Sequence, residues 1–115
     1  MIYVPRTSNS RSTPAPAATR NSKQTRALSP REVLTISRAL SDPRRFEILQ
    51  NIASEPCTAC SDLRGAFPIT AATLSHHLKE LESCGLIETS RRGKFIDVTF
   101  CRPAWEAYLA ELKKI

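Results

Sequence analysis

The chain has 115 residues, a hydrophobic content of 41% and a formal net charge of +6. This length suits a single domain with one modest core, and the apolar content is too high for a wholly disordered protein. No apolar run is long enough to cross a bilayer, and the first residues do not resemble a secretory signal peptide. We therefore expect a cytoplasmic protein with no membrane contact.

The basic excess lies at the start of the chain. Of the 17 basic residues, five fall in residues 1–27, which contain no acidic residue; residues 28–115 hold the other 12 and all 11 acidic residues. The first segment is rich in Ser, Thr, Ala and Pro, so we predict a flexible basic arm over 1–27 and one folded domain over 28–115. Two roles remain open for the arm: non-specific affinity for phosphate, or a solubilising extension.

The folded segment begins with two helix signals. Ser29-Pro30-Arg31-Glu32 is a capping box with proline at the first helical position, and it predicts a helix that ends near Ser41. Asp42-Pro43 opens a second helix, which Glu55-Pro56 ends. The predicted core stripe of this second helix consists of Phe46, Leu49, Ile52 and Ala53.

A short helix and a longer one follow. The short helix is predicted from about Ala59 to Gly65, and Thr70 is a good N-cap for the longer one, which Gly85 ends. A leucine stripe at helical spacing predicts one buried side for the longer helix: Leu74, Leu78 and Leu81. At about 100° per residue, the opposite side is small and polar; it carries Ala72, His76, Lys79 and Ser83, with Thr73 and Ser75 flanking them. This order is typical of a helix-turn-helix whose second helix enters the DNA major groove.

After Gly85 the pattern changes from helix to strand. Two strand-like runs, 86–90 and 95–100, are separated by Arg91-Arg92-Gly93-Lys94, which predicts a β-hairpin with a basic tip. A hairpin directly after such a helix is the wing of a winged-helix domain. The predicted fold class is therefore mainly α with a small hairpin: a winged helix-turn-helix with about five helices and a two-stranded wing.

Pro103 opens a last helix whose apolar stripe is too large to face water. Because the middle helices already fill the core of so small a domain, we expect the first and last helices to pack against a second copy in a twofold dimer. The predicted interface residues are Val33, Ile36, Trp105, Tyr108, Leu109 and Leu112. The alternative is that these residues pack within one chain.

Three segments together resemble the ArsR/SmtB family of winged-helix repressors. They are residues 39–49, residues 74–87 and the basic tip at 91–94, and the resemblance covers about residues 28–115. It implies a small dimeric repressor that binds a palindromic DNA operator and releases it on sensing an effector. It further implies that Thr73, Ser75, His76 and Lys79 face the groove, and that Arg91, Arg92 and Lys94 hold phosphate or the minor groove. For His77, nearer the buried stripe, a DNA contact and a packing role both remain open.

The four cysteines are candidates for the sensor. Cys57 and Cys60 form a Cys-x-x-Cys pair at the predicted start of the short helix, where backbone N–H groups favour a thiolate. Such a pair could bind arsenite or another soft metal ion, or close into a disulfide on oxidation. A metalloid usually needs a third thiolate, which could come from Cys101, from Cys84 or from a partner subunit; for Cys84 a packing role is favoured.

The resemblance limits this hypothesis. Arsenic-responsive members often carry Cys-x-Cys followed by Asp-Leu in this helix; here Asp62-Leu63 is kept, but the cysteines have a different spacing and lie further upstream. A regulator without a cysteine sensor therefore remains an alternative. A thiol oxidoreductase is a remote one, since no strand-like run precedes Cys57 and no other catalytic constellation occurs, so we expect no enzyme.

Overall fold

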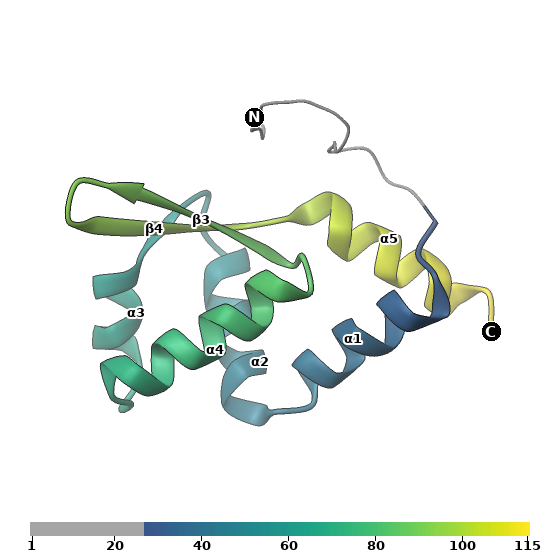
Figure 1. The fold of residues 1–115 in the computed structure, drawn as a ribbon, viewed down its shortest axis with the longest axis horizontal. Helices are drawn as coiled ribbons and strands as arrows, with labels where there is room; N and C mark the ends of the chain where they lie inside the picture. Colours follow the sequence, from purple (N-terminus) through teal and green to yellow (C-terminus); the bar gives the residue numbers. More distant parts are fainter. Residues whose placement is uncertain (1–26) are drawn as a thin grey trace. The chain divides into compact units, whose positions relative to one another are not determined.

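The computed structural model describes residues 27–115, which form two compact units (Figure 1). The larger unit is Ser29–Arg102, and the described part of the smaller unit is residues 27–28 together with Pro103–Ile115. Residues 1–26 of the predicted arm lie outside the described residues, so that prediction stays untested.

The first two helices begin where the capping residues predict. Helix α1 spans Pro30–Leu40, and its capping box is complete, because the Ser29 backbone N–H donates to Glu32 and the Glu32 N–H donates to the Ser29 hydroxyl. Helix α2 spans Pro43–Ala53, and the Asp42 carboxylate caps it by accepting from the Arg45 N–H at 2.8 Å.

The helix-turn-helix consists of α3, Cys60–Ala66, and α4, Ala71–Ser83. The Thr70 hydroxyl accepts from the Thr73 N–H at 3.1 Å and so caps α4, as predicted. At the other end Gly85 has a φ of +87°, and its N–H donates to the Glu82 carbonyl while the Leu86 N–H donates to the Leu81 carbonyl. This pair of bonds is a Schellman motif, which turns the chain from α4 directly into the sheet.

The sheet has one strand more than predicted. The wing hairpin consists of β3, Ile87–Arg92, and β4, Phe95–Phe100, joined at Gly93 with a φ of +64°, which suits a two-residue hairpin turn. A further strand, β2, Thr58–Ala59, pairs antiparallel with β4 and gives the order β2-β4-β3. The expected two-stranded wing is therefore a three-stranded sheet, because a two-residue strand has no periodicity for a sequence to reveal.

The core of the larger unit joins α2, α3 and α4 to the wing hairpin. Its fully buried side chains are Ile48, Ile52, Leu63, Leu81, Leu86, Ile87 and Val98. The stripe predicted for α2 is wrong at Phe46, which is 39% exposed, whereas Ile48 is buried instead. Leu49 and Ile52 are buried as predicted, and Ile48 extends their stripe to the side away from Phe46.

The smaller unit contains helix α5, Arg102–Lys113, whose first residue belongs to the larger unit. Within this unit the Leu28 backbone N–H donates to the Glu111 carboxylate at 3.2 Å. The helix ends at Lys113, and Ile115 beyond it is fully exposed. Among residues 27–115, no helix combines the length and the apolarity that crossing a membrane requires.

Candidate nucleic-acid interface

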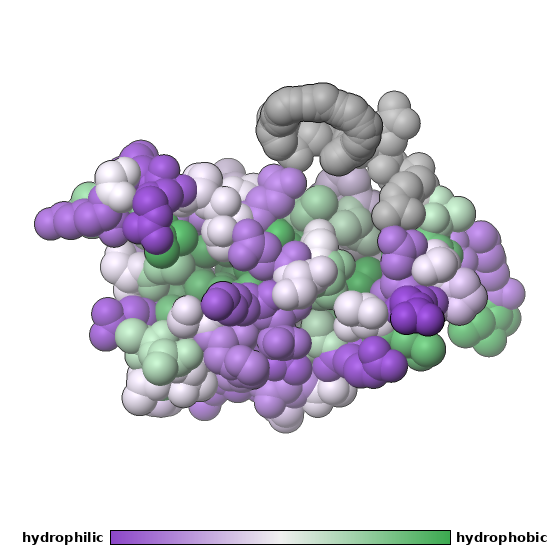
Figure 2. Space-filling view, viewed as in Figure 1, coloured by the Kyte–Doolittle hydropathy of each residue, from purple (hydrophilic) through white to green (hydrophobic). Residues whose placement is uncertain are grey.

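Helix α4 presents the polar face that its sequence predicts. Residues 71–73, Ser75, His76 and Lys79 are exposed, whereas Leu74, Leu78 and Leu81 are buried. Figure 2 shows hydrophilic residues over the region where α4 runs and at the projecting wing tip. Since α4 contacts α1, α2, α3 and β3, its buried stripe fixes the direction in which the polar face points.

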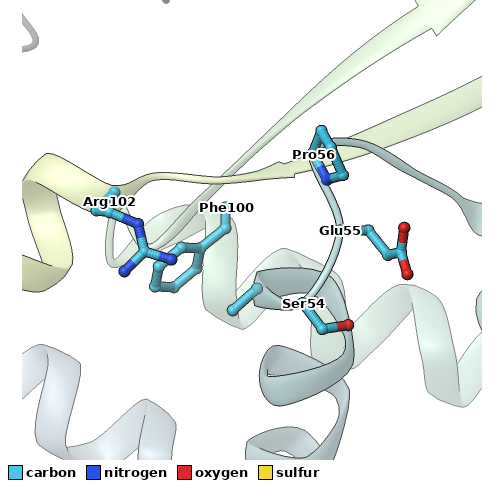
Figure 3. Close-up of a pocket in the computed structure, with 6 residues that line it drawn as sticks. Ser54, Glu55, Pro56, Phe100 and Arg102 are labelled. Carbon is cyan, nitrogen blue, oxygen red and sulfur yellow. The ribbon is translucent and has the colours of Figure 1, made fainter.

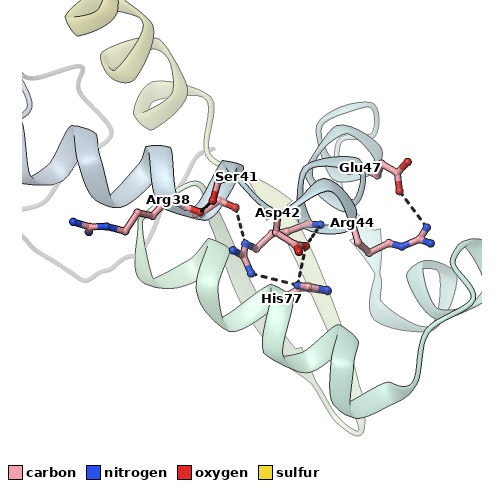
Figure 4. Close-up of polar contacts among 8 residues, drawn as sticks. Arg38, Ser41, Asp42, Arg44, Glu47 and His77 are labelled. Carbon is pink, nitrogen blue, oxygen red and sulfur yellow. Dashed lines mark hydrogen bonds and ion pairs between the residues drawn. The ribbon is translucent and has the colours of Figure 1, made fainter.

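His77 belongs to the supporting structure of α4, not to its polar face. Its side chain is only 10% exposed, and the Arg45 guanidinium donates to its Nδ1 at 3.4 Å (Figure 4). Arg45 also donates from Nε to the Ala39 carbonyl at 2.6 Å, while the Asp42 carboxylate lies 3.8 Å from Nδ1. One arginine thus joins the end of α1 to α4, and the sequence alone gave no signal for this cluster.

The chemistry of this contact favours one protonation state of His77. Because a guanidinium can only donate, the contact favours an accepting Nδ1, with the ring proton assigned to Nε2. Burial lowers the pKa of His77; Asp42 opposes that change, whereas Arg45, His76 and Arg44 add to it. Burial therefore favours the neutral form of His77.

The three wing cations occupy different environments. Arg91 and Lys94 are exposed, and Lys94 lies 5.7 Å from the centre of the Phe95 ring. Arg92 instead donates to Asp97 through two bonds, Nε to Oδ2 at 3.0 Å and Nη2 to Oδ1 at 3.2 Å. These hydrogen bonds, followed by the charge of Asp97, raise the pKa of Arg92. The carboxylate that neutralises Arg92 was not anticipated from the sequence.

The structure separates Cys57 from Cys60. Cys57 is exposed before β2, whereas Cys60 is half-buried as the first residue of α3. Both residues of β2 lie between them, so their Cα atoms are roughly 10 Å apart at a rise of about 3.3 Å per residue. A disulfide needs a Cα separation of about 4.4–6.8 Å. The pair therefore cannot be bridged while β2 is paired with β4.

The surroundings of the cysteines do not form a single-chain metal site. Burial, followed by the charge of Asp97, raises the pKa of Cys60, which opposes the thiolate expected at a helix start. Within residues 27–115, no three His, Cys, Asp or Glu side chains gather where they could hold a metal ion, Cys101 included. The Cys84 thiol donates to the Leu81 carbonyl at 3.3 Å, and burial raises its pKa, as a packing role implies.

The six predicted dimer residues differ in how much surface they leave for a partner. Ile36 and Tyr108 are 3% and 7% exposed within the single chain, so both are already covered. The sequence prediction omitted Leu34, which is 55% exposed on α1, whereas Leu112 on α5 is 39% exposed. Partial exposure is common to the other three: Val33, Trp105 and Leu109.

A pocket of about 360 Å³ lies between the turn after α2 and the end of β4 (Figure 3). Ser54, Glu55 and Pro56 form one side of it, and Phe100 with Arg102 forms the other, where the guanidinium lies 5.0 Å from the ring centre. None of the residues predicted to bind DNA or to sense an effector lines this pocket.

A short helix, a polar-faced helix and an adjoining antiparallel hairpin together define a winged helix-turn-helix domain. Residues 40–90 match a family model described as a helix-turn-helix domain. The chain is 36% identical over 61 residues to the transcriptional repressor SdpR of Bacillus subtilis, a match covering 53% of this chain and 67% of that protein. The chain belongs to the ArsR family of winged helix-turn-helix regulators.

The arsenical resistance operon repressor of Staphylococcus xylosus is 41% identical over 66 residues. This match covers 57% of the present chain and 62% of the repressor, so the chain spans less than two thirds of that relative. An ArsR-like regulator from Rhodococcus sp. RHA1 has a similar structure, with a TM-score of 0.67, 26% identity and coverage of 73% and 78% of the two chains. A Mycobacterium bovis domain described as homodimeric and DNA-binding has a TM-score of 0.59 at 25% identity, over 76% and 87% of the chains.

Proposed function

We propose that this protein is a cytoplasmic transcriptional repressor that binds a palindromic DNA operator as a homodimer. One observation carries the proposal: a rigidly supported helix exposes only small and polar side chains beside a basic hairpin. The names of the staphylococcal and Bacillus relatives, which are repressors, support the same conclusion.

The two parts of the surface have different tasks in this proposal. Thr73, Ser75, His76 and Lys79 on α4 read base edges, because their hydroxyl, imidazole and ammonium groups can donate or accept hydrogen bonds there. Arg91 and Lys94 on the wing supply the phosphate affinity that α4, with its single exposed lysine, lacks. In a twofold dimer the two α4 helices would occupy half-sites about one helical turn of DNA apart.

Binding to duplexes that the wild-type chain enriches from a random-sequence pool tests the proposal. We expect Arg91→Gln and Lys94→Gln to weaken binding to all duplexes about equally, and to lower the slope of log affinity against log salt by about 1 each. Ser75→Ala and His76→Ala should instead change which sequences are enriched. Equal affinity of the wild type for enriched and scrambled duplexes at moderate salt would reject sequence-specific binding.

We further propose that a thiol-reactive effector releases the DNA through Cys57 and Cys60. Because β2 separates these residues, any covalent link between their sulfur atoms must withdraw Thr58 and Ala59 from their pairing with β4, the inner strand of the wing. The pairing is short, and the buried Thr58 hydroxyl has no hydrogen-bond partner among residues 27–115, which costs about 1–3 kcal/mol. The Ala59 cap of α3 makes no side-chain bond either. Reaction at this pair would thus loosen both α3 and the wing.

An oxidant such as hydrogen peroxide gives a balanced reaction. The exposed Cys57 thiolate attacks one peroxide oxygen and becomes a sulfenic acid, with release of water after proton transfer. The Cys60 thiol then displaces the sulfenic oxygen as a second water, and the disulfide forms. Arsenite or a soft divalent metal ion would need a third ligand from outside this site, for example Cys101 of a second copy.

Titration of peroxide, arsenite and Zn²⁺ against a preformed DNA complex tests the thiol proposal. We expect peroxide to release wild-type protein, and Cys57→Ser or Cys60→Ser to abolish the release, whereas Cys84→Ser should leave it intact. If arsenite or Zn²⁺ releases the DNA and Cys101→Ser abolishes that release, a metal site shared between two copies of the chain is favoured. If no reagent releases the DNA, the sensor-free alternative is correct.

The remote alternative, a thiol oxidoreductase, has less support. Thioredoxin-like enzymes place the cysteine pair within a βαβ unit, whereas the sheet of residues 27–115 is antiparallel throughout. If the wild type reduces insulin and Cys57→Ser abolishes this activity, the oxidoreductase alternative is supported.

A further inference from the structure

The pairing of Arg92 with Asp97 sets this arginine apart from the other wing cations. Both residues lie on the same face of the hairpin, since Arg92 is in register with Phe95 and Asp97 lies two residues further along β4. The carboxylate accepts two bonds from the guanidinium, at 3.0 and 3.2 Å. The Arg92 side chain is nevertheless 67% exposed, whereas Asp97 is only 16% exposed.

A second contact restrains the same guanidinium. It lies 5.5 Å from the centre of the Phe95 ring, which is itself 49% exposed. A carboxylate on one edge and an aromatic ring nearby hold a planar group in one orientation, which reduces the rotamer entropy lost on binding. The Asp97 end of this arrangement is also fixed, because Asp97 is in register with Ser90 on β3 and with Ala59 on β2.

These contacts suit hydrogen bonding to bases better than attraction to phosphate. The ion pair is nearly neutral as a unit, so Arg92 adds little to the counterion release that drives phosphate binding. Its remaining N–H groups keep their direction and are not shared with Asp97. A planar guanidinium with a fixed fork of donors is the group that recognises acceptors on a base edge.

We infer that Arg92 reads a base edge in DNA and that Asp97 is its positioning residue. The inference rests on the DNA-binding function proposed above and assigns one of the three wing cations to sequence recognition. Arg91 and Lys94 keep the phosphate role.

The test compares affinities of the full chain for a duplex enriched from a random-sequence pool and for a scrambled duplex of equal composition. Arg92→Lys keeps the charge but removes the planar fork, and Asp97→Asn removes the ion pair while keeping the side-chain shape. We expect each to lower the specific-to-scrambled affinity ratio about tenfold or more. Arg91→Lys is the matched control on the neighbouring position, and its ratio should stay within about twofold of the wild type.

The outcomes separate this inference from the proposed function. If the wild type enriches no sequence, the proposed function itself fails. If sequences are enriched but Arg92→Lys leaves the ratio unchanged, or Arg91→Lys lowers it equally, the inference is wrong. If Asp97→Asn tightens binding to both duplexes by the same factor, Asp97 only neutralises charge, and the inference is also wrong. Because Arg92 is largely exposed, Arg92→Lys decides the matter even if Asp97→Asn lowers the melting temperature.

Discussion

The lowered pKa of His77 has a consequence for stability against acid. Its pKa is lowered in the folded chain, mainly by burial, so below about pH 6.5 the unfolded chain binds more protons than the folded one. The free energy of unfolding should therefore fall as the pH drops from 7 towards 5. In addition, a protonated Nδ1 would repel the Arg45 guanidinium that joins α4 to α1.

We expect His77→Gln to flatten this pH dependence, because glutamine can still accept a hydrogen bond but does not titrate. His76→Gln is the matched control, since His76 is the exposed neighbour on the same helix. Urea unfolding monitored by circular dichroism between pH 5 and 7 measures the effect. If the free energy of unfolding falls equally with pH for the wild type and His77→Gln, His77 is not the source of the pH dependence.

At the scale of elements, the exit from α4 depends on one backbone conformation. A side chain added at Gly85 would meet no atom within 4 Å. The loss of stability on substitution therefore comes only from the strain of a φ of +87° in a residue with a side chain. Gly85→Ala should therefore lower the free energy of unfolding by about 1–2 kcal/mol. It should also weaken DNA binding, since Leu86 leads directly into the wing.

Gly65 provides the control for Gly85. It is exposed in α3, has no atom within 4 Å of an added Cβ and does not have a positive φ. Gly65→Ala should raise the free energy of unfolding by about 0.5–1 kcal/mol, because alanine is the better helix former. Thermal melts of both variants measure the two effects, and two shifts of the same sign would contradict this account.

The helices and the hairpin could be predicted because their signals are local. Caps at Ser29, Asp42 and Thr70, the leucine stripe of α4 and the glycine after it each act within a few residues. Strand β2 has no such signal, since it exists only through its pairing with β4. Phe46 was misplaced because two overlapping stripes fit α2, and only the packing selects the one that contains Ile48.

The candidate DNA-binding site was also predictable where its signals are local. The sequence identified the exposed face of α4 and the basic tip, which follow from helical period and hairpin position. It did not reveal that Arg45 holds His77 or that Asp97 neutralises Arg92, because each pair depends on a rotamer and a register. Opposite charges near one another in sequence are too common to indicate a bidentate pair.

For the whole molecule, the proposed homodimer predicts that a charge placed in the predicted interface disrupts the dimer, whereas a charge elsewhere on the surface does not. Leu112→Glu should shift the protein from dimer to monomer, because it places a carboxylate in the predicted apolar interface. Phe46→Glu is a matched control, since Phe46 is also 39% exposed but lies outside the predicted interface. Sedimentation equilibrium over a range of concentrations measures both, and a dimer that survives Leu112→Glu would contradict this interface.

In the proposed function, helix α4 divides its residues between folding and DNA recognition. The side chains that hold it in the domain are buried, and Thr73, Ser75 and His76 are exposed. Substitutions on the exposed face should therefore be nearly neutral for stability, within about 0.5 kcal/mol. Descendants of a duplicated gene could then drift to new operators one residue at a time, without compensating changes elsewhere in the fold.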